Sequence, residues 1–447
     1  MRATDMTQGC PGRLIVAFAL PMMLGNVCQQ LYTIVDGAFV GRFAGITALA
    51  AVGAADWLCW LFMGIVQGYT IGFSVLISQR FGARDVEGLK KVVGMSVSLT
   101  AALALLLTAV SQAALGLALS LLGTPEDIFP QAVLYLRILF IGLPIFAAYN
   151  VMAAMLRAVG DAKSPLIAML IASFANIALD GLFVVSLHWG VAGAAAATLI
   201  AQGASAVYCF LVIRRLPMIR FGREDLRWEG RTVRRLISLG TPMAAQNLII
   251  GLGGMAVQRV INGFGRVFIA GFTATNKIYG LMEMAATSYG AALASYTGQN
   301  FGAKRFGRIR QGVNTGIVLG VVTALLIAAV LFITGRGVLS LFVDPAEELL
   351  DQVLDVAQLY LNYMLAALAA LYLLYVYRSA LQGMGDTLTP MISGIVELLM
   401  RVGTAMVLPR FLGQRGVYYA EPAAWLGAEI LLMIMYYVRI GKYKEET

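Results

Sequence analysis

The chain has 447 residues, of which 60% are hydrophobic and 13% are charged, and its net charge is +9. Soluble globular domains carry about 25% charged residues, so this composition excludes an ordinary water-soluble fold. The alternative solvent is lipid, in which a helix needs roughly 20 consecutive apolar residues to span the bilayer. Such segments fill the sequence, and no polar interval is long enough for a soluble domain. We therefore predict an all-α polytopic membrane protein.

Twelve transmembrane helices are predicted when the apolar runs are divided at charged or Gly/Pro-rich intervals. Their ranges are 13–37, 47–78, 91–118, 128–156, 165–187, 190–213, 231–262, 268–298, 310–334, 349–380, 390–411 and 421–440. The polar segment 1–11 precedes an apolar run that is too long for the core of a cleaved signal peptide. We therefore expect a multi-pass protein without such a peptide, whose surroundings are a lipid bilayer.

Lysine and arginine gather in alternate loops, and this distribution predicts how the chain is oriented. The largest group is the eight arginines between residues 214 and 235, and Arg378 is assigned to the same set of loops. The opposite loops hold five arginines, namely Arg42, Arg266, Arg336, Arg410 and Arg415. By the positive-inside rule both termini are expected in the cytoplasm and the protein in the cell membrane. The excess positive charge is thus a topology signal, and nucleic acid is not expected as a partner.

The sequence contains an internal repeat. The motif QRFGA at Gln79 recurs as QNFGA 220 residues later, and LRAVGDAKSPLI at Leu156 recurs as LQGMGDTLTPMI 225 residues later. Pro21 and Asn26 recur at a distance of 221 residues. Since each half holds six helices, the halves are predicted to be parallel repeats. The predicted domains are an N-terminal bundle at 1–213, a basic cytoplasmic linker at 214–235 and a C-terminal bundle at 236–447.

Four pairs of residues are predicted to open helices, because a side-chain oxygen before a proline at the first helical position is a typical N-terminal cap. The pairs are Thr124-Pro125, Ser164-Pro165, Asp344-Pro345 and Thr389-Pro390. These residues are interpreted as structural.

A few polar side chains lie where the bilayer interior is expected, and each suggests a function because burial of a charge there costs about 2.5–3.5 kcal/mol. Asn176 and Asp180 point the same way from one helix, and Thr198 and Asp36 could reach the same pocket. Two carboxylates, an amide oxygen and a hydroxyl suit a hard cation such as Na⁺. They equally suit a proton, because two close carboxyls cannot both be charged cheaply. The alternative is that Asp36 caps a helix near the outer surface and Asp180 binds nearby backbone.

In the second half, Glu397 and Arg401 are four residues apart on one helix and are predicted to form a structural ion pair. Glu283 has no obvious local partner and is the second candidate for a proton or a cationic substrate. Other polar, aromatic and methionine side chains could line a substrate cleft, and most such side chains in membrane helices are simply packed. The cleft candidates besides Glu283 are Gln246, Tyr149, Asn150, Met282 and Gln202. The four cysteines lack metal or disulfide spacing, so no metal cluster or cofactor is expected apart from the coupling ion.

At this point the residues resemble a known family. The segment PMMLGNVCQQLYTIVDGAFVGRFAGITALAAVG, the paired Q-[RN]-F-G-A motifs and the paired G-D-x-x-[ST]-P loops are similar to those of the multidrug and toxic compound extrusion (MATE) transporters. The resemblance implies two six-helix bundles around a central cleft that opens alternately to each side. It also implies a monomer that exports organic cations or other amphipathic small molecules in exchange for Na⁺ or H⁺.

The resemblance extends to the candidate coupling residues. One branch of the family carries an Asp on helix one, an Asn-x-x-x-Asp pair on helix five and a Thr on helix six. Here these positions read Asp36, Asn176, Asp180 and Thr198. Other members use an acid on helix seven, whereas residues 232–261 of this chain contain neither Asp nor Glu. A second coupling site on that helix is therefore not expected.

Two other classes of function stay open. Related superfamilies include flippases for lipid-linked saccharides, but a pyrophosphate substrate would favour a cleft rich in arginine, and the midspan cations identified are Lys277 and Arg401. An intramembrane enzyme is weaker still, because the sequence lacks a histidine-rich metal set or a nucleophile elbow. We therefore predict a secondary active transporter and not an enzyme.

Overall fold

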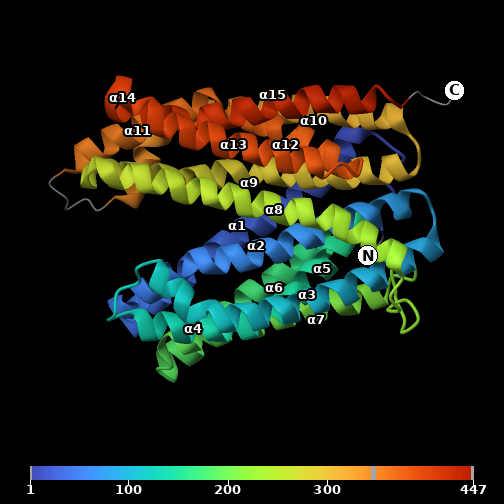
Figure 1. Ribbon diagram of the computed structural model, residues 1–447, viewed down its shortest axis with the longest axis horizontal. Coiled ribbons are helices and arrows are strands. Elements are labelled where there is room, and N and C mark those ends of the chain that lie inside the picture. The colour runs from blue at the N-terminus through green and yellow to red at the C-terminus, as the bar shows by residue number, and fades with distance from the viewer. Residues whose placement is uncertain (1–2, 344–348, 444–447) are drawn as a thin grey trace. The chain divides into compact units, whose positions relative to one another are not determined.

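The computed structural model describes residues 3–343 and 349–443, which form helices joined by turns (Figure 1). Contacts divide the chain into two compact units. Unit 1 comprises the N-terminal segment up to Asp5 together with Leu20–Ala244, and unit 2 comprises Met6–Ala19 together with the residues from Ala245 onward. The predicted domains at 1–213, 214–235 and 236–447 stay predictions, since these units describe packing alone.

Unit 1 is built from the larger part of α1, six whole α-helices and the first part of α8. They are α1 (Pro11–Phe39), α2 (Ile46–Gly82), α3 (Val86–Leu121), α4 (Phe129–Ile141), α5 (Leu143–Ala158), α6 (Lys163–Asp180), α7 (Gly190–Arg214) and α8 (Gly230–Ile261). Helix α6 packs along α7, and α5 packs against α2, α3 and α7. Two short π-helical segments, η1 (Val40–Ala44) and η2 (Gly181–Ser186), extend α1 and α6.

Unit 2 contains the rest of α8 and seven further α-helices. They are α9 (Arg266–Gly302), α10 (Phe306–Leu339), α11 (Leu350–Ala366), α12 (Leu368–Gly383), α13 (Leu388–Val407), α14 (Pro409–Leu412) and α15 (Ala420–Ile440). Short 3-10 segments lie at Asn262–Phe264 (η3), Ser340–Phe342 (η4) and Gly413–Tyr419 (η5). Helix α12 packs on α9 and α15, and α13 runs along α15 (Figure 1).

Two helices that were predicted as single spans are broken. The predicted helix 128–156 is α4 and α5, bent by 47°, and the predicted helix 349–380 is α11 and α12, bent by 48°. At the first bend, Pro144 cannot donate a backbone hydrogen bond. A Cβ on Gly142 would lie 2.0 Å from Leu199 Cδ2, so the close approach of α7 requires glycine there.

The number of membrane spans follows from length and composition. Eight stretches of described chain are long and apolar enough to cross a membrane, and the two bent pairs raise this number to ten. One of the eight, Leu388–Ile440, joins α13 and α15. Counting these two separately and adding the 37-residue α9 gives the twelve predicted helices. The prediction of an all-α polytopic fold is confirmed.

The internal repeat is visible in the backbone. Arg84 and Lys304, which follow the two Q-x-F-G-A motifs, both have φ of +57°, and Gly160 and Gly385 of the two G-D motifs both have φ of +83°. The aspartates after these glycines cap α6 and α13, as their carboxylates accept N–H bonds from Ser164 and Thr389 respectively. The predicted capping role of Ser164 and Thr389 was therefore wrong, because both hydroxyls donate to these same aspartates.

The predicted helix start at Thr124-Pro125 was also wrong. Residues 125–128 form a turn and α4 begins at Phe129, without a side-chain cap. The pair Asp344-Pro345 lies outside the described residues.

Helices α1 and α8 each contribute to both units. The boundary falls after Ala19 in α1 and after Ala244 in α8, within two residues of the internal prolines Pro21 and Pro242. A proline inside a helix removes one backbone hydrogen bond and eases bending at that point. Two of the three places where the chain passes from one unit to the other therefore lie beside an internal proline.

Candidate cation site

Four oxygen-bearing side chains predicted to act together lie close to one another in unit 1. The carboxyl groups of Asp36 on α1 and Asp180 on α6 lie close enough to interact electrostatically. One turn before Asp180, Asn176 donates from Nδ2 to Thr198 Oγ1 on α7 at 3.4 Å. Asp180 and Asn176 are buried, at 0% and 1% exposed, whereas Asp36 and Thr198 are partly buried. The set spans three helices and lies entirely within one unit.

Four carboxylate and amide oxygens of this cluster have no donor among the described residues. Both carboxylate oxygens of Asp180, Oδ1 of Asp36 and Oδ1 of Asn176 are buried, and no donor group of the described residues hydrogen-bonds to them. Two buried carboxylates repel each other unless a positive charge lies between them. The arrangement therefore fits a proton or a hard cation such as Na⁺, which takes carboxylate, amide and hydroxyl oxygens. It does not support the alternative in which Asp180 binds nearby backbone.

Both acids stand next to a widened stretch of helix. Asp180 immediately precedes η2, and Asp36 lies four residues before η1. The two π segments contact each other. Such π-helical turns are rare and frequently occur at functional sites, because they free backbone carbonyls and re-aim side chains. Sequence reasoning missed them, and the signal that was available is the glycine directly after each aspartate, Gly37 and Gly181.

The sequence analysis also did not identify two tyrosines that lie near this cluster. Tyr32, one turn before Asp36 on α1, and the buried Tyr135 on α4 are close enough to interact electrostatically with the Asp36 carboxyl. Nothing in their local sequence distinguishes them from packed aromatic residues, so only the tertiary structure identifies them.

In unit 2, Glu283 has partners that the sequence did not reveal. Its Oε1 accepts hydrogen bonds from the hydroxyls of Tyr279, one turn away at 3.0 Å, and Tyr375 on α12 at 2.7 Å. The interpretation of Glu283 as lacking a local partner was therefore wrong. Its role in a substrate cleft stays a prediction.

The predicted ion pair of Glu397 and Arg401 belongs to a larger buried network. Glu397 pairs with Arg378 of α12, whereas Arg401 Nη2 lies 3.9 Å from Glu397 Oε2. Arg401 instead faces Glu421 of α15, with two nitrogen–oxygen distances of 2.9 Å. The assignment of Arg378 to a loop was wrong, because this residue lies inside α12 and is 5% exposed.

The remaining cleft candidates divide between the units. In unit 1, Tyr149 packs against the core, Asn150 donates to its own helix backbone at Phe146, and Gln202 Oε1 is buried without a described donor. In unit 2, Gln246 is 3% exposed. A cleft formed by these residues together stays a prediction.

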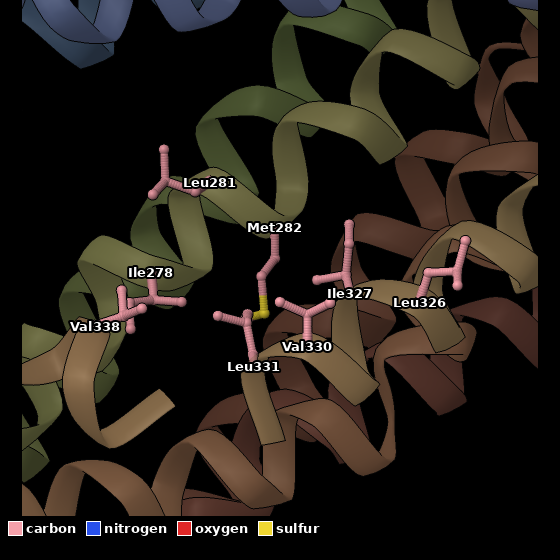
Figure 2. A pocket seen from close by; sticks show the side chains of 8 residues that line it. All are labelled: Ile278, Leu281, Met282, Leu326, Ile327, Val330, Leu331 and Val338. Atoms are coloured by element: carbon pink, nitrogen blue, oxygen red, sulfur yellow. The ribbon is translucent and has the colours of Figure 1, made fainter. Parts of the chain in front are cut away.

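Met282 lines an apolar pocket of unit 2, and its role in a substrate cleft stays a prediction. The pocket has a volume of about 370 Å³. Figure 2 shows the Met282 side chain reaching toward Leu331 and Val330 of α10. Its lining is entirely hydrophobic: Ile278, Leu281, Met282, Leu326, Ile327, Val330, Leu331 and Val338. Met282 and the neighbouring Glu283 therefore have quite different surroundings.

The fold and the two polar clusters define a membrane transporter built from two repeated helical units. The family model MatE matches residues 21–182 and 242–407, one match in each repeat. The chain belongs to the MatE family, whose members are transporters and not enzymes.

Individual relatives match over nearly their whole length. A probable multidrug resistance protein of Bacillus subtilis, YoeA, is 28% identical over 97% of this chain and 95% of its own. The multidrug export protein MepA of Staphylococcus aureus is 21% identical over 95% and 94%. Among solved structures, a MOP superfamily transporter from Pyrococcus furiosus is 25% identical, with a TM-score of 0.93 over 100% of this chain and 99% of that one.

Proposed function

We propose that this transporter exports amphipathic or cationic small molecules in exchange for Na⁺ or H⁺, with the coupling ion held by Asp36, Asn176, Asp180 and Thr198. The observation that carries the proposal is the convergence of buried oxygens from α1, α6 and α7 without a described donor for Asp180. The names of the multidrug resistance relatives support the class of substrate.

The physical role of the ion follows from charge repulsion. A cation or proton between Asp36 and Asp180 neutralises that repulsion and so favours the arrangement in which α1 and α6 hold the two acids together. An ion shifts a conformational equilibrium only through its different affinities for the two conformations. We propose alternating access on this basis, with binding from outside favouring the conformation that releases substrate.

The proposal also includes the setting of the protein. Uneven lysine and arginine distribution supports a cell-membrane protein with both termini in the cytoplasm. The expected partners are the bilayer and small molecules, with the protein acting as a monomer. The flippase alternative has no described feature in its favour, since the buried guanidinium groups of Arg378 and Arg401 are both engaged by carboxylates.

Dye efflux from proteoliposomes tests the proposal, with an imposed Na⁺ gradient at fixed pH and separately with an imposed pH gradient. Asp36→Asn and Asp180→Asn should each abolish the gradient-dependent part of efflux while leaving the folded protein intact. The matched control is Glu126→Gln, an exposed acid of unit 1 that should behave like wild type. Undiminished gradient-driven efflux by both asparagine variants would refute the site.

A further inference from the structure

The helix pair α1 and α6, which holds the candidate cation site, has a counterpart in unit 2, the pair α8 and α13. One close contact is found at the same positions in both pairs. On α1 and α6, a Cβ on Gly25 would lie 3.0 Å from Met169 Sδ. The residues 221 and 225 positions later are Gln246 on α8 and Gly394 on α13, and a Cβ on Gly394 would lie 3.2 Å from Gln246 Cγ. In the first pair the glycine lies on α1, and in the second pair it lies on α13, but the two positions in contact are the same. The repeat therefore aligns α1 with α8 and α6 with α13 in register.

Moving along both pairs by equal steps reaches the site. Eleven residues on, Asp36 and Asp180 correspond to Val257 and Ala405, so the second half lacks both acids at these positions. Seven residues on, Tyr32 and Asn176 correspond to Gly253 and Arg401. The amide of the first half is thus replaced by a guanidinium group in the second.

The surroundings of Arg401 accommodate this charge. Its Nη1 lies 3.3 Å from where a Cβ of Gly253 would be, so the glycine leaves room for the guanidinium against α8. Asn176 bonds to Thr198 on α7, the last whole helix of unit 1, and Arg401 bonds to Glu421 on α15, the last helix of unit 2. The corresponding positions therefore each donate a hydrogen bond, to α7 and α15 respectively, but Asn176 is uncharged whereas Arg401 carries a positive charge.

We propose that Arg401 is a built-in cation that takes, in unit 2, the place that an exchangeable cation takes in unit 1. A guanidinium group stays charged at every physiological pH and cannot leave. Arg401 thus neutralises Glu421, and Arg378 neutralises Glu397, without an ion from solution. This place in unit 2 therefore does not take part in ion exchange. The functional meaning rests on the proposed function of unit 1, but the test addresses unit 2 alone.

The test uses the full-length protein with Asp180→Asn, which disables the unit 1 site, and measures the midpoint of thermal unfolding in NaCl and in choline chloride of equal ionic strength. Adding Arg401→Asn should lower the midpoint in choline chloride by roughly 5–10 °C, because Glu421 loses its partner. NaCl should recover a large part of this loss in a saturable way, since the introduced amide, together with Glu397 and Glu421, then offers an oxygen set like that of unit 1. Adding Glu421→Gln as well should remove the Na⁺ response.

A conservative control keeps the charge. With Arg401→Lys, the midpoint should be equal in the two salts. Equal loss in NaCl and choline chloride for the Arg401→Asn protein would overturn the proposal, because the vacated place would then not accept a cation.

A second measurement does not depend on the folding of the Arg401 variant. The Asp180→Asn protein with Arg401 intact should have the same midpoint in both salts. A Na⁺-specific stabilisation of this protein that Glu421→Gln abolishes would show that unit 2 exchanges a cation beside Arg401, which would overturn the proposal. An absent Na⁺ response in the wild type would instead show that the unit 1 site takes a proton or no ion, and the dye-efflux assay separates these two outcomes. The Arg401 result can be interpreted in either case.

Discussion

Asp85 links the end of α2 to the start of α3 through its carboxylate. Oδ1 accepts the N–H of Gly88 at 2.9 Å, and Oδ2 accepts from Arg80 at 2.6 Å. The Gly88 hydrogen bond is the largest cause that holds the pKa of Asp85 below its usual value of 3.8; burial opposes it, and the Arg80 guanidinium also lowers the pKa. Since the folded-state pKa is lowered, the charged form stabilises the fold above that value, and the contribution is lost as the pH falls through the lowered pKa.

We predict that Asp85→Asn removes this part of the acid sensitivity. Asparagine is as good an N-cap as aspartate, so the variant should unfold at nearly the wild-type temperature at low pH. It should gain less stability as the pH rises from the lowered pKa of Asp85 to 3.8, and it should stay less stable than the wild type above that pH. Thermal unfolding of both proteins in detergent between acid and neutral pH checks this expectation. Parallel curves over the whole range would contradict it.

At the residue scale, the sequence located the candidate site well but not its neighbours. The spacing of Asn176 and Asp180 follows from helix periodicity, and the structure brings both together with Asp36 and Thr198. Arg378 was misplaced because its partner, Glu397, lies on a separate helix, and no local pattern reports a contact between helices. The two hydroxyls on Glu283 show the same limit, since one of them comes from α12.

At the scale of elements, glycines on α2 allow a close approach of the first part of α8. Gly64, Gly68 and Gly72 recur every four residues and so share one face. A Cβ on Gly68 would lie 2.4 Å from Ala244 Cα, and one on Gly72 would lie 2.5 Å from Gly240 Cα. Small residues at such spacing let helix backbones approach in membranes, and here the approach joins two helices of unit 1.

Gly68→Ala and Gly72→Ala should therefore each destabilise the protein, by about 1–3 kcal/mol, because the added methyl group meets backbone that cannot move aside. Gly53→Ala is the matched control on the same helix, since a Cβ there has nothing within 4 Å. That variant should be neutral or slightly more stable, given the higher helix propensity of alanine. Unfolding midpoints in one detergent compare the three, and equal midpoints for all would argue against a tight contact.

The elements themselves were predictable to the extent that they are apolar and unbroken. The bend between α4 and α5 lies where Gly142 meets Leu199 of α7, and a contact between two helices leaves no sign in the local hydrophobicity of either one. The caps by Asp161 and Asp386 were within reach of the sequence, because both follow a glycine in the repeated G-D motif. The cap was assigned to the nearby Ser164 and Thr389 because each directly precedes a proline, which is the usual pattern of a helix N-terminus.

At the scale of the whole molecule, the proposed exchange has a definite charge balance. If one Na⁺ or H⁺ enters as one monovalent organic cation leaves, no net charge crosses the membrane. A membrane potential supplies about 2.3 kcal/mol per charge and 100 mV, so it would then do no work on the cycle.

We accordingly predict that efflux of a monovalent cationic dye, driven by an ion gradient, is unchanged when a potassium diffusion potential is imposed with valinomycin. Efflux of a neutral dye should respond to the same potential, because the coupling ion then carries the only charge. A strong response of the monovalent dye would show that more than one ion enters per cycle, in conflict with an ion-exchanging site in unit 1 alone.

Because α1 and α8 each belong partly to both units, the chain cannot be cut into two fragments that each contain one whole unit. A gene cut in the link between α7 and α8 would give a first product that carries Met6–Ala19, which packs in unit 2, and a second product that carries residues up to Ala244, which pack in unit 1. Each fragment, made alone, would lack a piece of its own interior and would display a piece that belongs to the other. Separately produced halves should therefore be degraded singly and survive only when synthesised together, and an ancestor of half this length would have needed a second copy of itself to be complete.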